Sequence, residues 1–537
     1  MNFRKMMAAL LLCGGASLFL TGCGETSAVK PDGSMIFYRY DKSDPTGPDT
    51  AVLTASAAPA AQLTDLQMKL AKVYDQRVKA KEDAQKKAAA ARAAKARAAA
   101  AAKEAEKPKA SPADMKAAEE LVASLKGSVK KGKGGAIIGL TMAASSVASQ
   151  DEAAAAPEGD AEQDAPEPAN LTAEDMELIG RLADLESVSF EGSAFDDETC
   201  APLANLKKLN HVTINNANIG DATLEMLATL PELTYLDIRR DLKLANASLE
   251  ILQKMPKLTE LHAHYNSFTN SGMNKIAKVK TLKVVYVRGC SDVSDNGAKY
   301  LARLPEIEQL YFRFMITNAG VEYLAAAPNL KYVEFQDCND INAGAVEAFK
   351  KMPALTGIRI FRCKGFDDET LRGLAARQLE RLELRDLNIS NAGIAALKDQ
   401  QGLKTVEFSE LASVDAAGLT DLLGSLKGIT KMSFFTIPLT NEGVAKIVEN
   451  NPEMSEFAAR AVTIDDGAID HILKFQKLTV LDLRSNNGVS ADAYLRLGQM
   501  KSLKTLYLKD TTITAKGNEA QLAELKKALP KTRIVEN

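Results

Sequence analysis

P-K-L-T-E-L-H-A-H-Y-N-S-F-T-N-S-G-M-N-K-I-A-K-V (256–279), K-T-L-K-V-V-Y-V-R-G-C-S-D-V-S-D-N-G-A-K-Y-L-A-R-L (280–304) and P-E-I-E-Q-L-Y-F-R-F-M-I-T-N-A-G-V-E-Y-L-A-A-A (305–327) are three neighbouring copies of one pattern. Its opening apolar residue recurs fourteen times, at residues 185, 209, 233, 258, 282, 307, 330, 355, 379, 403, 429, 454, 478 and 503. Every step lies between 23 and 26 residues, a period that indicates a solenoid. Since a solenoid grows lengthwise, the 537-residue length does not require several domains.

Each copy predicts a strand, a turn and a helix. The first, fourth and sixth residues are apolar, as in Leu233, Leu236 and Ile238, which is the spacing of a short strand with one buried face. The residue before each helix is Ser, Thr, Asn or Asp in twelve of the fourteen copies, and these side chains accept the free N–H groups of a first helical turn. The cap positions are Asp196, Gly220, Ala245, Thr269, Ser294, Thr317, Asn342, Asp367, Ser390, Asp415, Thr440, Asp465, Ser490 and Thr514. The expected fold is an α/β solenoid.

The repeats resemble leucine-rich repeats, in particular the cysteine-containing, ribonuclease-inhibitor-like kind. Cys290, Cys338 and Cys363 follow their strands in C-S-D-V-S-D-N-G, C-N-D-I-N-A-G and C-K-G-F-D-D-E-T, and Asn266 and Asn486 hold the same position elsewhere. The resemblance covers about 171–537 and implies a horseshoe whose turn residue hydrogen-bonds the backbone. F-box-type partners of some relatives are not expected, because no F-box precedes the repeats. Cys200 is expected in the core, and no disulfide is expected between Cys338 and Cys363, although adjacent rungs allow one.

The N-terminus reads as an export signal. Arg4 and Lys5 precede an apolar run (6–20), and Leu20-Thr21-Gly22-Cys23 follows, which resembles the bacterial lipobox. The resemblance implies that residues 1–22 are removed and that Cys23 carries lipid, with an uncleaved short anchor as the alternative. Gly24 favours the outer membrane over the inner one, by analogy. The expected location is thus the bacterial cell envelope.

Residues 23–170 are predicted to hold no domain core. The segments are a Pro/Ser/Ala-rich flexible tether (23–61), an Ala/Lys-rich helical spacer (62–127) and a low-complexity linker (128–170). From Lys69 to Lys133 there are 18 Lys/Arg and 8 Asp/Glu, but a single aromatic residue, Tyr74, so the stretch lacks interleaved aromatics and nucleic acid is not an expected partner. A short helix is expected at 113–126. A capping box, Thr172-Ala-Glu-Asp175, predicts another helix, expected to cap the stack.

The third, fifth and seventh residues of each strand are predicted to line the concave face. They include a run of aromatic and basic side chains, which are enriched at binding hot spots. These candidate ligand-binding residues are Tyr235, Arg239, His262, His264, Tyr286, Arg288, Tyr311, Arg313, Tyr332, Phe361 and Arg385. The arginines suit a carboxylate-bearing or anionic partner, whether a protein, a peptidoglycan-type glycan or an anionic polysaccharide. The alternative is that these arginines only form ladders with neighbouring Glu and Asp.

No catalytic function is expected. The chain has no H-E-x-x-H, Walker A, G-x-S-x-G or strand-linked G-x-G-x-x-G motif, and no cofactor is predicted. Glu260-x-His262-x-His264, with Asp237 nearby, has the alternation of a two-histidine metal site, but chance polar occupancy of a concave face explains it more simply, so no metal is predicted. Two functions remain: a lipid-anchored module that binds a protein on its concave face, and a structural envelope component that associates with cell-wall polysaccharide or peptidoglycan.

Overall fold

The computed structural model describes residues 110–143 and 171–536, and before them four short strands. These strands, β1 (Ser17–Thr21), β2 (Glu25–Val29), β3 (Met35–Arg39) and β4 (Val52–Ser56), pair antiparallel in chain order. They belong to a separate compact unit, residues 1–107, and fall in the stretch predicted as signal and tether, where no strand was expected. The rest of that stretch, the spacer before residue 110 and the linker after residue 143 lie outside the described residues.

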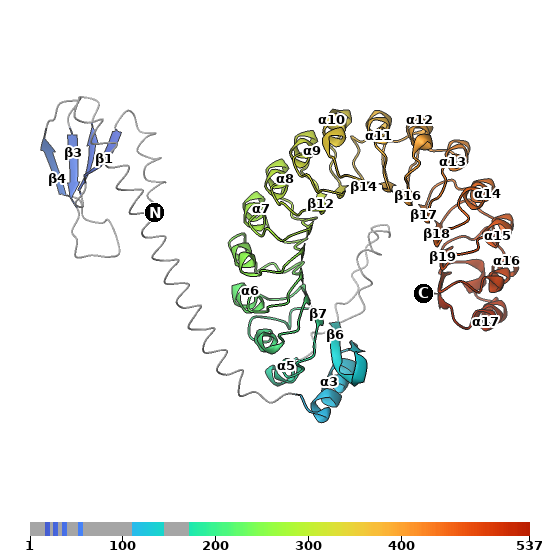
Figure 1. The fold of residues 1–537 in the computed structure, drawn as a ribbon, viewed down its shortest axis with the longest axis horizontal. Helices are drawn as coiled ribbons and strands as arrows, with labels where there is room; N and C mark the ends of the chain where they lie inside the picture. Colours follow the sequence, from blue (N-terminus) through green and yellow to red (C-terminus); the bar gives the residue numbers. More distant parts are fainter. Residues whose placement is uncertain are drawn as a thin grey trace. The chain divides into compact units, whose positions relative to one another are not determined.

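The second unit, residues 108–537, is built on one continuous sheet that curves into an open arc (Figure 1). Its strands are β5 (Ser128–Lys131), β6 (Ile137–Ala143), β7 (Ser187–Glu191), β8 (His211–Asn215), β9 (Tyr235–Asp237), β10 (Glu260–His262), β11 (Val284–Tyr286), β12 (Gln309–Arg313), β13 (Tyr332–Gln336), β14 (Gly357–Phe361), β15 (Arg381–Arg385), β16 (Thr405–Ser409), β17 (Lys431–Phe435), β18 (Glu456–Arg460), β19 (Val480–Asp482), β20 (Thr505–Tyr507) and β21 (Arg533–Val535). Each strand pairs with the next in the chain, antiparallel for β5–β6 and parallel from β6 onward. The fourteen predicted strands are β7–β20, so the leucine-rich repeat solenoid is confirmed.

Helices cover the outer side of the arc, while the strands line its inner side (Figure 1). The α-helices are α3 (Pro112–Ser124), α5 (Ala173–Gly180), α6 (Asp221–Leu227), α7 (Asn270–Ile276), α8 (Asp295–Leu301), α9 (Asn318–Leu324), α10 (Val346–Lys351), α11 (Asp368–Ala375), α12 (Asn391–Ile394), α13 (Ala416–Leu423), α14 (Asn441–Asn450), α15 (Asp466–Ile472), α16 (Ala491–Leu495) and α17 (Glu519–Ala528). Several repeats use 3-10 turns instead or in addition: η3 (Ala201–Asn205), η4 (Ser248–Lys254), η5 (Ala343–Ala345), η6 (Ala395–Asp399), η7 (Arg496–Gln499) and η8 (Thr512–Thr514). No helix among the described residues is long and apolar enough to cross a membrane.

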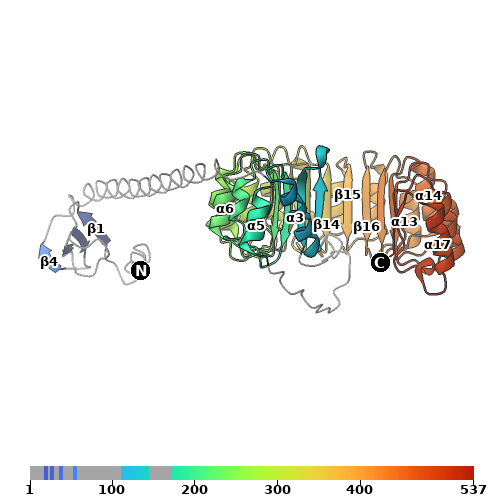
Figure 2. The same cartoon turned by 90° about the horizontal axis from the view of Figure 1, so that it is seen from below.

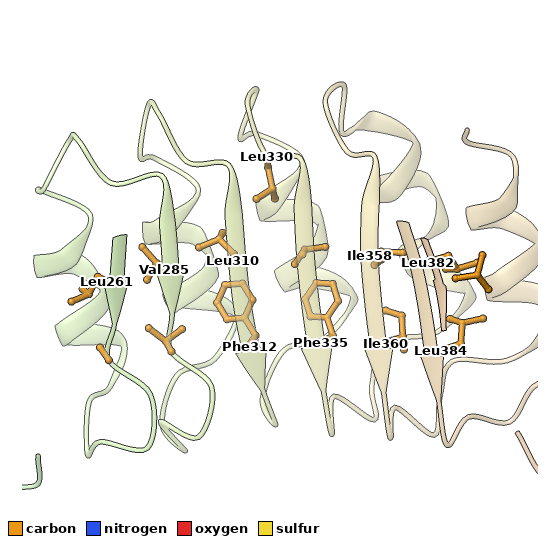
Figure 3. Packing of buried hydrophobic residues seen from close by; sticks show 14 of the residues in the cluster. Leu261, Val285, Leu310, Phe312, Leu330, Phe335, Ile358, Ile360, Leu382 and Leu384 are labelled. Atoms are coloured by element: carbon orange, nitrogen blue, oxygen red, sulfur yellow. The ribbon is translucent and has the colours of Figure 1, made fainter. Parts of the chain in front are cut away.

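The core lies between the sheet and the helices and runs unbroken along the arc. Strand positions four and six point into it, as Leu310 and Phe312 do in β12 (Figure 3). Their neighbours Val333 and Phe335 continue the same rows in β13, and all four are at most 1 % exposed. Because each repeat buries its apolar face only against the next, the stack needs closed ends.

The N-terminal end of the stack differs from the prediction. Strand β6 pairs in parallel with β7, and Leu140 and Met142 enter the same core rows, so the sheet starts within the segment predicted as linker. Helix α3 matches the short helix expected at 113–126 but packs on the sheet end, where Ala118 and Val122 are buried. The capping box at Thr172–Asp175 is present, yet helix α5 belongs to the outer row and does not close the stack. Helix α3 and the antiparallel strand β5 close this end of the stack instead.

Side-chain hydrogen bonds join one repeat to the next at the helix starts. The predicted cap side chain accepts a first-turn N–H in nine helical segments, for instance Thr317 from Ala319. The residue after the cap then accepts the N–H of the following repeat's cap residue, as Asn391 Oδ1 does from Asp415 at 3.0 Å. Gly418 lies against that bond, and a Cβ there would sit 2.2 Å from Asn391 Oδ1. The recurrent N-x-G and D-x-G motifs therefore serve as connections between repeats.

Candidate functional site

The concave face is formed by positions three, five and seven of successive strands, as predicted. The parallel register aligns each position into a row along the arc, so that Asp237, His262 and Tyr286 are direct neighbours in the fifth row. Figure 2 shows strands such as β14, β15 and β16 lying side by side. A large side chain at one of these positions therefore contacts its counterparts one strand away.

An aromatic stack crosses six consecutive strands, β8 to β13. Its rings are those of His211, Tyr235, His262, Tyr286, Tyr311 and Tyr332. The closest pairs, His211–Tyr235 and Tyr286–Tyr311, have centroids 3.6 Å apart and nearly parallel planes. The guanidinium of Arg381 lies over the Tyr332 ring, 4.7 Å from its centroid. In the three stacked pairs, His211–Tyr235, His262–Tyr286 and Tyr286–Tyr311, the ring faces thus cover one another.

The arginines of the concave face are in ion pairs. Arg313 Nε lies 2.6 Å from Asp337 Oδ2, and Arg385 Nε lies 2.8 Å from Glu410 Oε2. Arg239 likewise contacts Asp237 at 2.7 Å. Short ladders, the alternative considered for these arginines, are therefore present.

A longer run, the ion-pair lattice, joins Arg288, Glu334, Arg359, Glu383 and Arg381. Glu334 accepts Arg288 Nη1 at 3.1 Å and faces Arg359 Nη1 at 3.6 Å. Arg359 Nε lies 3.3 Å from Glu383, which also contacts Arg381. Glu334 and Glu383 are 2 % and 4 % exposed, so the two carboxylates of this lattice are buried against guanidinium partners.

The structure brings the predicted site residues together but buries more than half of them. His264, Arg288, Tyr311, Tyr332, Phe361 and Arg385 are all less than 9 % exposed. Phe361 lies among the guanidinium groups of Arg359, Arg362 and Arg385, at 5.8, 4.5 and 4.6 Å from its centroid. Tyr235, Arg239, His262, Tyr286 and Arg313 keep intermediate exposure. More than half of the predicted residues are thus buried, and they support the side chains that remain accessible.

Sequence reasoning missed His211, which ends the aromatic stack, and it did not specify which carboxylate pairs with which arginine. A signal for His211 and for paired charges was present. His211 shares the third row with Tyr235, and charge alternates along the fifth row through Glu334, Arg359 and Glu383. Only the identity of each ion-pair partner required the structure.

The two histidines of the considered metal site do not converge with a third ligand. His262 Nε2 lies 2.7 Å from Glu260 Oε1, while His264 is 5 % exposed between arginines. Burial lowers the pKa of His264 to about 2, and the positive charges of Arg239 and Arg288 act in the same direction. Among the described residues no group of three His, Cys, Asp or Glu side chains could hold a metal ion.

The turn residues that follow the strands occupy equivalent positions in successive repeats and form a buried column. Cys290 Sγ donates to Ala263 O at 3.3 Å, and Asn266 Nδ2 donates to Ile238 O at 2.8 Å. The N–H of Cys338 lies 3.3 Å from Cys363 Sγ, and both thiols are free. Cys200 is free as well and fully buried, as expected. The cysteines thus have the structural role that the resemblance implied.

No family model and no curated protein matches the chain. Solved structures with similar repeats include the Rad7–Elc1 complex of yeast (14 % identity, 68 % of this chain and 89 % of that chain, TM-score 0.45) and an internalin of Listeria monocytogenes (17 %, 58 % and 82 %, TM-score 0.36). A leucine-rich repeat protein of Leptospira interrogans is 16 % identical over 66 % of this chain and 91 % of that one, with a TM-score of 0.27. The repeat geometry described above, and not these likenesses, establishes the leucine-rich repeat fold.

Proposed function

We propose that this protein is a lipid-anchored binding module of the bacterial cell envelope, which recognises a protein on the concave face of its solenoid. The observation that carries the proposal is the continuous surface made by the aromatic stack and the ion-pair lattice across β8–β15. The side chains of this surface already hold one another in place, so they would lose little conformational entropy when a partner binds. Preorganised aromatic and arginine side chains are the usual centre of protein interfaces.

Two features favour a protein over an anionic polysaccharide. Arginines that already have carboxylate partners offer no net positive surface to a polyanion. Rings that stack on one another at 3.6 Å do not present free faces on which a sugar ring could lie. A protein surface of mixed charge fits both features, because hydroxyl groups and ring edges can contact a peptide backbone.

Photo-crosslinking in intact cells tests the proposal with the full chain. The photoreactive residue p-benzoylphenylalanine replaces His211, which is exposed at the end of the aromatic stack, or, as the control, Tyr323 on the outer helix α9. We expect a discrete protein adduct from position 211 that position 323 does not give. Adducts that sediment with cell-wall material would support the structural alternative instead, and equal adducts from both positions would refute recognition on the concave face.

Lipid anchoring rests on the sequence around Cys23. Its test is labelling with radioactive palmitate, which we expect to mark the wild-type chain and not Cys23→Ser, together with release of that variant from the membrane fraction. Strand β1 ends at Thr21, so processing before Cys23 would leave β2–β4 as the start of the mature protein. Mass spectrometry of the mature N-terminus checks this, and an intact residue 1 would contradict it.

A further inference from the structure

The fifth row of the concave face alternates in charge until it reaches β16. Glu334, Arg359 and Glu383 are direct neighbours on β13, β14 and β15, and Arg359 contacts both carboxylates. The next residue in the row is Glu407, which stands directly opposite Glu383. Like charges opposite one another on adjacent strands are destabilising. Among the described residues no cation is ion-paired with Glu407 and no donor is hydrogen-bonded to it.

The next two residues of the fifth row after Glu407 have small side chains. Ser433 is its register partner on β17, and Ala458 follows on β18, and both are partly exposed. Every other residue of this row from Asp237 to Tyr507 is larger: Asp237, His262, Tyr286, Tyr311, Glu334, Arg359, Glu383, Glu407, Asp482 and Tyr507. The Glu407 carboxylate, which has no ion-pair partner, therefore lies beside two strands, β17 and β18, whose fifth-row side chains are short.

Side chains in the third and seventh rows border these short side chains. Lys431 pairs with Glu456 at 2.6 Å on one side, and Arg460 lies 5.2 Å from the Phe435 ring centroid on the other. Each of these two cations has a carboxylate within ion-pair distance, since Arg460 Nε also lies 3.8 Å from Asp482 Oδ2. Glu407 is therefore the group left to bind a ligand. A second polar group is unsatisfied on the same face of β16: Ser409 is 1 % exposed, and its Oγ has no hydrogen-bond partner.

The electrostatic environment of Glu407 agrees with this geometry. Burial raises the pKa of Glu407 above its ordinary value, Glu383 raises it further, and Arg359, Arg460 and Arg385 only partly oppose the rise. The carboxylate is thus desolvated without enough compensating charge. A cation placed beside it would relieve that cost.

We propose that Glu407, above Ser433 and Ala458, receives a basic side chain of the protein partner, Lys or Arg. This inference rests on the proposed function and adds the chemistry of one contact. The charges of the fifth row alternate as far as Glu383, and Glu407 interrupts the alternation. The incoming cation would supply the positive charge that Glu407 lacks. Several N–H donors on a guanidinium or ammonium group suit a carboxylate, which accepts hydrogen bonds at both of its oxygens.

The first test supplies the missing cation from the protein itself. Ser433→Arg in the full chain should place a guanidinium opposite Glu407, with Ser433→Gln as a control of similar reach and no charge. We expect Ser433→Arg to raise Tm by about 1–3 °C over Ser433→Gln, and Glu407→Gln to abolish that difference. Equal Tm values for the two Ser433 variants would show that Glu407 is not in need of a cation and would overturn the proposal.

The second test uses N-acetylarginine amide as the probe and N-acetylcitrulline amide as its neutral analogue. The arginine probe should raise Tm of the wild-type chain more than the citrulline probe does. This difference should be lost in Glu407→Gln and in Ser433→Arg, and kept in Glu449→Gln on the outer helix α14. An equal shift in the wild type and Glu407→Gln would refute the site.

The crosslinking experiment separates this inference from the proposed function. If the adduct at position 211 forms but persists unchanged in Glu407→Gln and Ser433→Arg, the partner binds elsewhere on the face and the basic contact is wrong. If the arginine probe binds but position 211 gives no adduct, the cation site stands and the proposed function fails. A loss of the adduct in both variants, at unchanged protein level, supports the two together.

Discussion

Asp241 occupies the turn position that Asn266 and Asn486 hold in other repeats, but with an acid in place of an amide. Its Oδ1 accepts the N–H of Ala217 at 2.8 Å, while Oδ2 is buried without a partner. The amide of Asn266 shows what is missing, since it donates to backbone carbonyls from the equivalent place. Burial raises the pKa of Asp241 to about 8, so folding favours its protonated form.

The consequence is a stability that depends on pH. With a folded pKa above the unfolded one, stability is full below about pH 4 and is lost as pH rises towards 8. Asp241→Asn should remove this loss and stabilise the protein by roughly 2–4 kcal/mol at pH 7, because the amide supplies the donor. Urea unfolding at pH 5 and pH 8 measures it. A variant no more stable than the wild type at pH 8 would contradict the assignment, and Asp340→Asn in an exposed turn is the control.

Thr436 is another residue whose conformation its neighbours impose. Position eight of all fourteen repeats has positive φ, and at Thr436 φ is 46°. The N–H there donates to Arg460 O at 3.1 Å and continues the ladder past the strand end. A β-branched side chain is poorly suited to this region, whereas Asn tolerates it.

Thr436→Asn should therefore raise the free energy of unfolding by about 0.5–1 kcal/mol. Thr436→Val keeps the branched shape and should give no gain. Chemical unfolding of the two variants beside the wild type checks the comparison. Equal effects of Asn and Val would show that backbone strain at this position is negligible.

At the scale of the element, each helix start depends on the preceding repeat. The Asn391 side chain joins α12 to the cap of α13, and the absence of a side chain at Gly418 leaves room for it. The same pair recurs along the arc, as Asp295 with Gly320 and Asp368 with Gly393. Glycine in these helices is therefore required by packing between repeats and not by its own φ, which is helical.

A double-mutant cycle tests this connection. Asn391→Ala should cost about 1 kcal/mol, because the Asp415 N–H loses its acceptor. Gly418→Ala should cost about 1–3 kcal/mol in the wild type through overpacking. In the Asn391→Ala background the sign should reverse, since alanine is the better helix former once the amide is gone. Additive effects would disprove the proposed contact.

For the whole molecule, the closed N-terminal end of the stack decides whether the solenoid is stable and monomeric by itself. Strand β5 is the edge strand, pairs antiparallel and carries Lys130 and Lys131 at a register shift, which are features that discourage further pairing. Without residues 110–143 the β7 edge and the core residues Val188 and Phe190 would lose their cover. The domain boundary predicted at residue 171 cuts through this contact.

Two fragments test the boundary. Residues 108–537 should be monomeric and as stable as the full chain, while 171–537 should associate or unfold at lower temperature because an apolar edge is exposed. Light scattering and thermal unfolding distinguish them. A monomeric 171–537 fragment with unchanged Tm would show that the cap contributes nothing.

The repeats themselves were predictable because each one encodes its strand, turn and helix locally. The period identified fourteen strands and the buried positions four and six, and nine of the twelve predicted cap side chains accept a first-turn N–H of a helical segment. The end strand β6 also had a signal: Ile137, Leu140 and Met142 match the first, fourth and sixth positions, 48 residues or two periods before Leu185. The low-complexity surroundings hid it.

What the sequence alone determined is thus the solenoid and the identity of the side chains that line its concave face. Only the tertiary structure decided which of them remain available. Arg288 and Glu334 are 46 residues apart in the chain, yet their contact helps to bury both. A periodic pattern specifies which side chains share a row. Whether a charge is paired and whether two rings stack depends on distances between side chains of different repeats, which the pattern does not give. For the same reason Glu407, one carboxylate among many in the sequence, emerges as a carboxylate of the concave face that has no ion-pair partner among the described residues.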